Sequence, residues 1–292
     1  GSGVCIQYYP SGQTLYAASS GTSHSTPAAA GAASLLDYFY RVNFGGQSPS
    51  PAMVKAYLVN SARYLTGSGA NDTLPSPNQG FGRVDLGRAF DQTPRFLVDQ
   101  TTTFSSSGQV YEFNGAIVDS QKPLRVTLAW TDAPGPTSGN AYVNNLDLEV
   151  IVNGQIYRGN AFSGANSITG GVADVRNNVE SVFLPAGVSG SVTVRVRAFN
   201  IAGDGVPGNG DPTDQDFALV VYNASNQAGM LQGIVRTASG NNPIPGTTVE
   251  AKNPDGITYR TTTAADGSYN LQLGVNTYTV SAWKFGYSLQ SV

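Results

Sequence analysis

From residue 95 to residue 223, apolar and polar side chains alternate along the chain. Segments 126–130, 146–150 and 192–196 carry an apolar residue at every second position, which is the period of a strand with one buried face. Loops rich in Gly, Asn, Asp and Pro separate these segments. The pattern predicts an antiparallel β-sandwich or jelly roll for this part of the chain.

The residues before this block follow a helical pattern. Leu35, Leu36, Phe39 and Tyr40 form an apolar stripe that predicts a helix over 25–41. Ser50 followed by Pro51 predicts the start of a second helix, because serine caps helices and proline fits the first turn. The further predicted elements are a strand at 4–6, the end of the second helix near 62, a glycine-containing turn at 78–85 and a short helix at 86–90.

A third region begins near residue 229. Short apolar segments alternate with tight turns such as 243–246 and 266–267, which predicts a small second β-sandwich. The predicted organisation is therefore three units with the boundaries 1–92, 93–226 and 227–292.

The segment Gly21-Thr22-Ser23-His24-Ser25-Thr26-Pro27 is the main candidate for chemistry. A tight turn ahead of a helix exposes the Ser23 hydroxyl, and the free N–H groups of the first turn favour negative charge beside it. The small residues 28–33 allow the helix to lie close to neighbouring backbone. Ser23 is therefore the candidate nucleophile, although a serine before a helix is often only a cap.

This segment resembles the nucleophile motif of subtilisin-like serine peptidases, Gly-Thr-Ser-x-(Ser/Ala)-x-Pro. The helix that begins at Pro51 and the turn Gly80-Phe81-Gly82 resemble the last part of the same catalytic domain. The resemblance implies a multidomain chain: the C-terminal piece of an α/β subtilisin-like catalytic domain, followed by two all-β sandwich domains. It also implies that the Ser23 backbone N–H supplies part of an oxyanion hole.

The catalytic triad is incomplete within these residues. Ser-His-Asp catalysis needs a histidine that takes the serine proton, and the chain has one histidine, His24. A residue next to Ser23 on a helix points about 100° away, so we expect His24 to be a packing or surface residue. The resemblance places the Asp and His upstream of the serine. We therefore expect a polypeptide substrate, a partner in the missing N-terminal part of the peptidase domain, and an inactive chain on its own.

The two β regions also resemble known domains. Residues 128–132, 143–148, 177–180 and 216–221 are similar to the β-domain that follows the catalytic domain in one branch of subtilases. Residues 229–292, with the closing turn Lys284-Phe285-Gly286-Tyr287, resemble carboxypeptidase-regulatory-like sandwiches. The resemblance implies a bracing role for the first domain.

Hard oxygen ligands, which calcium prefers, gather at two places in the predicted large sandwich. The second place is a Gly- and Pro-rich loop whose four carboxylates repel one another unless a cation relieves them. The candidate ligands are Asp132, Asn145 and Asp147 in the first group, with Asn144, Asp174, Asn177 and Glu180 beside them, and Asp204, Asp211, Asp214 and Asp216 in the second. The alternative is a solvated loop, since the spacing is not that of an EF-hand. The proposed chemistry itself needs no cofactor.

Composition narrows the class of protein. A net charge of −3 argues against a nucleic-acid partner, which would require a basic surface. No apolar run has the length of a membrane span. One cysteine, few charges (12%) and many Tyr and Thr residues are typical of a secreted bacterial β-rich protein.

Two other functions stay open at this point. One is a non-catalytic secreted β-sandwich module that binds calcium, a polysaccharide or a cell surface. The other is a peptidase reconstituted from this chain and a separate N-terminal chain. Upstream Asp and His segments would distinguish the first of these from a peptidase.

Overall fold

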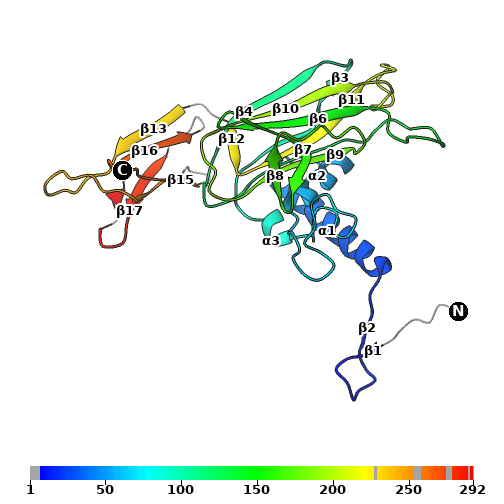
Figure 1. Ribbon diagram of the computed structural model, residues 1–292, viewed down its shortest axis with the longest axis horizontal. Coiled ribbons are helices and arrows are strands. Elements are labelled where there is room, and N and C mark those ends of the chain that lie inside the picture. Colours follow the sequence, from blue (N-terminus) through cyan, green and yellow to red (C-terminus); the bar gives the residue numbers. More distant parts are fainter. Residues whose placement is uncertain (1–6, 227–228, 253–257, 274–277, 289, 292) are drawn as a thin grey trace. The chain divides into compact units, whose positions relative to one another are not determined.

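The computed structural model describes residues 7–226, 229–252, 258–273, 278–288 and 290–291. The strand predicted at 4–6 lies outside these residues. The chain divides into two compact units, residues 1–48 and residues 49–292. Figure 1 shows the elements of each unit along the chain.

The first unit carries a short hairpin and one long helix. Strands β1 (Gln7–Tyr8) and β2 (Ala17–Ala18) pair, and α1 spans Thr22–Asn43. The helix starts three residues before the predicted Ser25, because Gly21 serves as its N-cap with φ +153°, a conformation suited to glycine. At its other end the Phe44 ring packs on Tyr40, with ring centroids 5.0 Å apart.

Two faces of α1 differ in exposure. Ala32, Leu36 and Tyr40 recur every four residues and are buried. The exposed apolar side chains of the helix are Leu35, Tyr38 and Val42, which are 54%, 66% and 65% exposed. This helix therefore presents an uncovered apolar surface to solvent.

The second unit begins with two helices. Helix α2 (Pro51–Ser61) starts as predicted, and the Ser50 hydroxyl accepts a hydrogen bond from the Met53 N–H at 3.0 Å. The short helix α3 (Leu86–Ala89) is capped by Asp85, whose side chain accepts from the Arg88 N–H. Among the described helices, none is both long and apolar enough to cross a membrane.

Ten strands form two antiparallel sheets that share one apolar core. The six-stranded sheet has the order β12-β4-β10-β6-β7-β8, and the four-stranded sheet has the order β3-β11-β5-β9. This arrangement agrees with the predicted sandwich. The strands are β3 (Arg95–Phe104), β4 (Val110–Ile117), β5 (Leu124–Ala129), β6 (Asn145–Val152), β7 (Gln155–Ser163), β8 (Asn166–Thr169), β9 (Val179–Leu184), β10 (Ser191–Asn200), β11 (Gln215–Tyr222) and β12 (Ala224–Asn226).

The two central strands of the four-stranded sheet, β11 and β5, are covered on both faces. Every residue of β5 and β11 is buried, because one face of these strands lies on the core and the other contacts α2. Thr127 and Ser181 are buried on neighbouring strands, and their hydroxyls lie 3.0 Å apart. A strand that is buried on both faces tends to carry apolar residues at successive positions. The alternation of apolar and polar side chains is therefore weaker in β5 and β11 than in the strands with a solvated face.

The C-terminal region forms two smaller sheets. Strands β13 (Gly229–Ile234) and β16 (Ser268–Leu273) pair with each other, and the second sheet has the order β15-β14-β17-β18. The bounds of the second sheet are β14 (Thr248–Lys252), β15 (Thr258–Thr262), β17 (Thr279–Trp283) and β18 (Gln290–Ser291). Val118 of the large sandwich packs with Ala251 and Tyr259 of this region, and its carbonyl accepts from the Arg260 N–H.

The glycine turn that precedes α3 yields a stability test. Gly82 has φ +119°, and a Cβ there would lie 2.4 Å from the Arg63 carbonyl oxygen. We expect Gly82→Ala to lower the free energy of unfolding by about 2–4 kcal/mol. Gly80 also has positive φ but open space around it, so Gly80→Ala should cost about 1 kcal/mol. Urea denaturation measures both; equal losses would contradict the steric argument.

Candidate active site

Ser23 lies in the first turn of α1 with its side chain exposed to solvent. The N–H groups of His24 and Ser25 both donate to the Gly21 carbonyl. The Ser23 N–H comes before these bonds and has no carbonyl one turn earlier in the helix. Among the described residues this N–H has no hydrogen-bond acceptor, and its part in an oxyanion hole stays a prediction.

The hydroxyl groups beside Ser23 are already bonded. Ser25 Oγ donates to the Thr22 carbonyl at 3.2 Å, and Thr26 Oγ1 donates to the same carbonyl at 2.8 Å. Within the part of the chain that the structure describes, Ser23 Oγ makes no hydrogen bond. Of these three hydroxyls, Ser23 is the one that remains available as a nucleophile.

His24 does not face Ser23. Its Nε2 lies 2.9 Å from Ser19 Oγ, on the segment ahead of the helix. Because the sequence holds one histidine, no imidazole of this chain is placed to take the Ser23 proton. The role of Ser23 as a nucleophile therefore stays a prediction, and its base would have to come from outside these residues.

The first group of predicted calcium ligands is occupied by hydrogen bonds. Asp132 accepts from the Val143 and Asn144 N–H groups, both at 2.8 Å. Asn145 Nδ2 donates to Asp147 Oδ1 at 3.1 Å. Asp132 thus binds backbone N–H groups of the 132–144 loop, whereas Asp147 binds the side chain of Asn145.

Asn144 joins the two predicted groups into one network. Its Nδ2 donates to the Gly203 and Asp214 carbonyls, both at 3.1 Å, and to Gln215 Oε1 at 2.9 Å. Its Oδ1 accepts from the Ala202 and Gly203 N–H groups. The structure thus unites the 132–144 loop with the acidic loop, which the sequence analysis treated separately.

The acidic loop does not bring its four carboxylates together around one point. Asp214 is fully buried and accepts from the Val206 N–H at 3.0 Å and from Asn209 Nδ2. Asp211 accepts from the Thr213 N–H at 3.1 Å. Asp204 and Asp216 each have one buried carboxylate oxygen with no hydrogen-bond partner among the described residues.

Glu180 lies on β9 of the four-stranded sheet and is 1% exposed. Its Oε2 accepts from the Leu148 N–H at 2.8 Å, and its Oε1 has no partner among the described residues. Burial raises the pKa of this carboxyl well above its usual value, and the charges of Asp147 and Asp174 act in the same direction. Burial also raises the pKa of Asp147.

The described side chains contain no group of three or more His, Cys, Asp or Glu residues arranged to hold a metal ion. Calcium also accepts amide and backbone carbonyl ligands, which this criterion leaves aside. A calcium site at the predicted residues stays a prediction.

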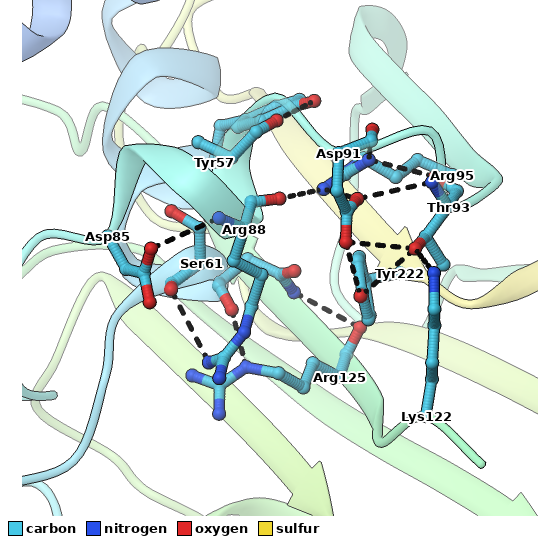
Figure 2. A network of polar contacts seen from close by, with 12 residues as sticks. Tyr57, Ser61, Asp85, Arg88, Asp91, Thr93, Arg95, Lys122, Arg125 and Tyr222 are labelled. Atoms are coloured by element: carbon cyan, nitrogen blue, oxygen red, sulfur yellow. Dashed lines mark hydrogen bonds and ion pairs between the residues drawn. The ribbon is translucent and has the colours of Figure 1, made fainter.

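Sequence analysis missed a buried polar network at the end of α2 (Figure 2). Arg125, on β5, donates to the carbonyls of Asn60 and Ala62, and Arg88 donates to the Ala62 carbonyl at 2.9 Å. The Arg125 guanidinium also stacks on the Phe183 ring, 3.3 Å from its centroid. Two cations thus satisfy helix-terminal carbonyls that have no partner inside the helix.

The Arg125 group has no carboxylate partner among the described residues, and burial lowers its pKa well below the usual value. Asn60 supports it from the helix: its Nδ2 donates to the Arg125 carbonyl at 3.1 Å and to Thr127 Oγ1 at 3.2 Å. The sequence signal that could have indicated this contact is an arginine between two apolar residues in a predicted strand, Leu124-Arg125-Val126.

A second part of the network follows α3 (Figure 2). Asp91 accepts from Arg95 Nη2 at 2.9 Å, from Thr93 Oγ1 at 2.9 Å and from the Tyr222 hydroxyl at 2.8 Å. Burial raises the pKa of Asp91, but the Tyr222 bond and the Arg95 charge outweigh it, so this pKa is lowered. Lys122 Nζ donates to Thr93 Oγ1. These contacts join the segment after α3 to β3, to β11 and to Lys122 in the loop before β5.

Comparison with protein families agrees with both resemblances. Residues 1–82 match the subtilase family, and residues 230–292 match the carboxypeptidase regulatory-like domain. The chain therefore contains a subtilase-family segment at its start and a carboxypeptidase regulatory-like domain at its end. No curated protein matches the chain.

Solved structures give distant similarities. A Bacillus licheniformis lipase in its propeptide form is 9% identical, with 69% of this chain and 44% of that chain covered and a TM-score of 0.24. The T6 backbone pilin of Streptococcus pyogenes is 11% identical, with 68% and 50% covered and a TM-score of 0.21. The group B streptococcus pilus 2b backbone protein is 15% identical, with 68% and 88% covered and a TM-score of 0.19. This chain spans half or less of the first two structures.

The buried arginine gives a prediction. The planar guanidinium of arginine donates to several carbonyls at once. Lysine has a single ammonium group, which cannot reach all of these carbonyls. We expect Arg125→Lys to lower the free energy of unfolding by about 1–3 kcal/mol, measured by urea denaturation. The exposed Arg195, paired with Glu112 on the sandwich surface, is the control, and Arg195→Lys should leave the midpoint unchanged. Equal effects of the two substitutions would contradict the capping role.

Glu180 gives a pH prediction. Because its folded pKa is raised, its stabilising contribution is complete below the unfolded pKa, about 4.3, and is lost as the pH rises toward the folded pKa. The unfolding free energy should therefore fall with rising pH over this window, and Glu180→Gln should flatten that fall. Thermal unfolding at a series of pH values in a chelating buffer measures it; an unchanged slope in the variant would assign the effect to another group.

Proposed function

We propose that this chain is the C-terminal part of a subtilisin-like serine endopeptidase in which Ser23 is the nucleophile. The observation that carries the proposal is the exposed Ser23 hydroxyl, free of hydrogen bonds to the described residues, on the first turn of α1 inside a subtilase-family segment. The substrate is a polypeptide.

The chemistry assigns one role to each available group. Ser23 Oγ attacks the scissile carbonyl carbon as its proton passes to a histidine base, and the carbonyl oxygen becomes an oxyanion. The Ser23 N–H donates to that oxyanion, with the helix N-terminus favouring its charge. The C–N bond then breaks, and the amine leaves with the proton from the histidine. The histidine and its orienting aspartate come from outside these residues.

The uncovered face of α1 supports a missing partner. Leu35, Tyr38 and Val42 are each more than half exposed, as are Tyr9 and Tyr16 ahead of the helix. A central helix of a catalytic domain buries such side chains against a sheet. We assign this surface to the N-terminal part of the peptidase domain.

The large sandwich acts as a brace in this proposal, because α2 rests on β5 and β11 and is capped by Arg125. We also propose that the protein is secreted and that calcium stabilises the acidic loop. The unpartnered buried oxygens of Asp204 and Asp216 support the latter, since a cation would satisfy them.

The proposal is tested on this chain extended by its own upstream coding sequence. Ser23→Ala should lower casein hydrolysis by a factor on the order of 10⁴ or more and abolish labelling by a fluorophosphonate probe. Ser25→Ala is the matched control, because the Ser25 hydroxyl bonds to helix carbonyls, and it should keep most of the activity. Residues 1–292 alone should not be labelled. Undiminished hydrolysis by the Ser23→Ala protein would refute the assignment.

A further inference from the structure

The carboxypeptidase regulatory-like domain contains a pocket of about 400 Å³. It opens between the segment that continues β13 and the turn that follows β17, so its walls come from both small sheets. Its volume lies in the range of small-ligand sites. Neither the proposed peptidase chemistry nor the brace uses this pocket.

Apolar and aromatic groups line much of the pocket. Ile244 is buried, Val235 and Ala282 are partly buried, and the Trp283 and Tyr287 side chains lie in the same lining. The Tyr287 N–H donates to the Lys284 carbonyl at 3.1 Å and closes a turn, in which Gly286 has φ +88°. A closed turn holds Tyr287 beside the pocket.

Two cations and no carboxylate stand in the same lining: Arg236 and Lys284. Arg236 Nη1 donates to the Asn241 carbonyl at 2.9 Å, and Lys284 Nζ donates to the Pro245 carbonyl. Neither forms an ion pair with a described carboxylate. Each keeps further N–H donors for a ligand.

The carboxylate of Asp266 lies near enough to Arg236 for the arginine charge to affect its pKa. Hydrogen bonds from Ser268 lower the pKa of Asp266, and the Arg236 charge contributes to the lowering. Asp266 is not part of the pocket lining. In a chain of net charge −3, the lining is therefore a local cationic site beside an apolar surface.

We propose that this pocket binds the C-terminal end of a polypeptide. A last residue with an apolar side chain combines an apolar group with a carboxylate on one carbon atom, which matches a lining of apolar groups and two cations. Arg236 and Lys284 bind the α-carboxylate through charge-assisted hydrogen bonds. The apolar side chain packs on Ile244 and Trp283. An acidic sugar has a carboxylate but lacks the apolar side chain, so the lining favours the peptide.

Tryptophan fluorescence tests the proposal on residues 1–292, since the other tryptophan, Trp130, is only 2% exposed in the sandwich core. The probes are N-acetyl-Gly-Phe-Leu with a free carboxylate and the same peptide as its C-terminal amide, at low ionic strength. The acid should change the Trp283 emission saturably, and the amide should bind at least about tenfold more weakly.

Variants locate the site. The double variant Arg236→Gln, Lys284→Gln should weaken the acid at least about tenfold and bring it level with the amide. Lys252→Gln removes one exposed charge from the same domain outside the pocket and should bind like the unaltered chain. Far-UV circular dichroism checks that each variant is folded.

Three results would overturn the proposal. Equal binding of acid and amide by the unaltered chain would show that the cations do not recognise the carboxylate, whatever the variants do. Tighter binding of a trigalacturonate than of the peptide acid would assign the pocket to an acidic polysaccharide. No saturable change with millimolar peptide acid would leave the pocket without this ligand.

Discussion

The arrangement of the second unit depends on how the carboxyl end of α2 is satisfied. The last carbonyls of a helix have no partner within it, and burying them without donors is costly. Here Arg88 and Arg125 approach these carbonyls from α3 and from β5. Because a guanidinium carries several donors in one plane, each side chain bonds to more than one carbonyl at the helix end. The helix, the short helix after it and the sheet are thereby fixed together.

The same contact explains the unusual burial of the four-stranded sheet. A sandwich sheet normally has a solvated outer face, which gives alternating side chains. In β5 and β11 the outer face contacts α2, and Thr127 of β5 is buried with its hydroxyl 3.0 Å from that of Ser181 on the neighbouring strand β9. The helical segment is therefore part of the sandwich's packing, although it belongs to the subtilase match by sequence.

Sequence alone predicted the parts of this structure that local rules determine. The Ser50 cap of α2 and the alternation of Val192, Val194 and Val196 follow from side-chain preference and strand period. The contacts of Arg125 and Asn144 were not predicted, since their partners lie far away along the chain. The acidic residues were predicted as calcium ligands, and the structure adds that Asp132 and Asp214 accept hydrogen bonds from backbone N–H groups of their loops. Composition alone does not predict these contacts.

Ser23 could be singled out as the candidate nucleophile because its surroundings are local. The turn, the helix start and the free hydroxyl of Ser23 all lie within a few residues. The rest of a serine peptidase site is assembled from distant segments, so the sequence pointed to one member and to the absence of an imidazole partner among these residues.

The hydrogen bond from Asn60 to the Val220 carbonyl joins residues that are 160 positions apart. This separation affects the order in which the chain can fold during its synthesis. During synthesis α2 leaves the ribosome long before β11, the strand that completes its binding surface. Until then the helix has no sheet to cover, and contacts of such long range form slowly. The intervening strands must remain soluble for that interval. Separating the chain near residue 92, the predicted boundary, would therefore part α2 from the strands β5 and β11 on which it packs.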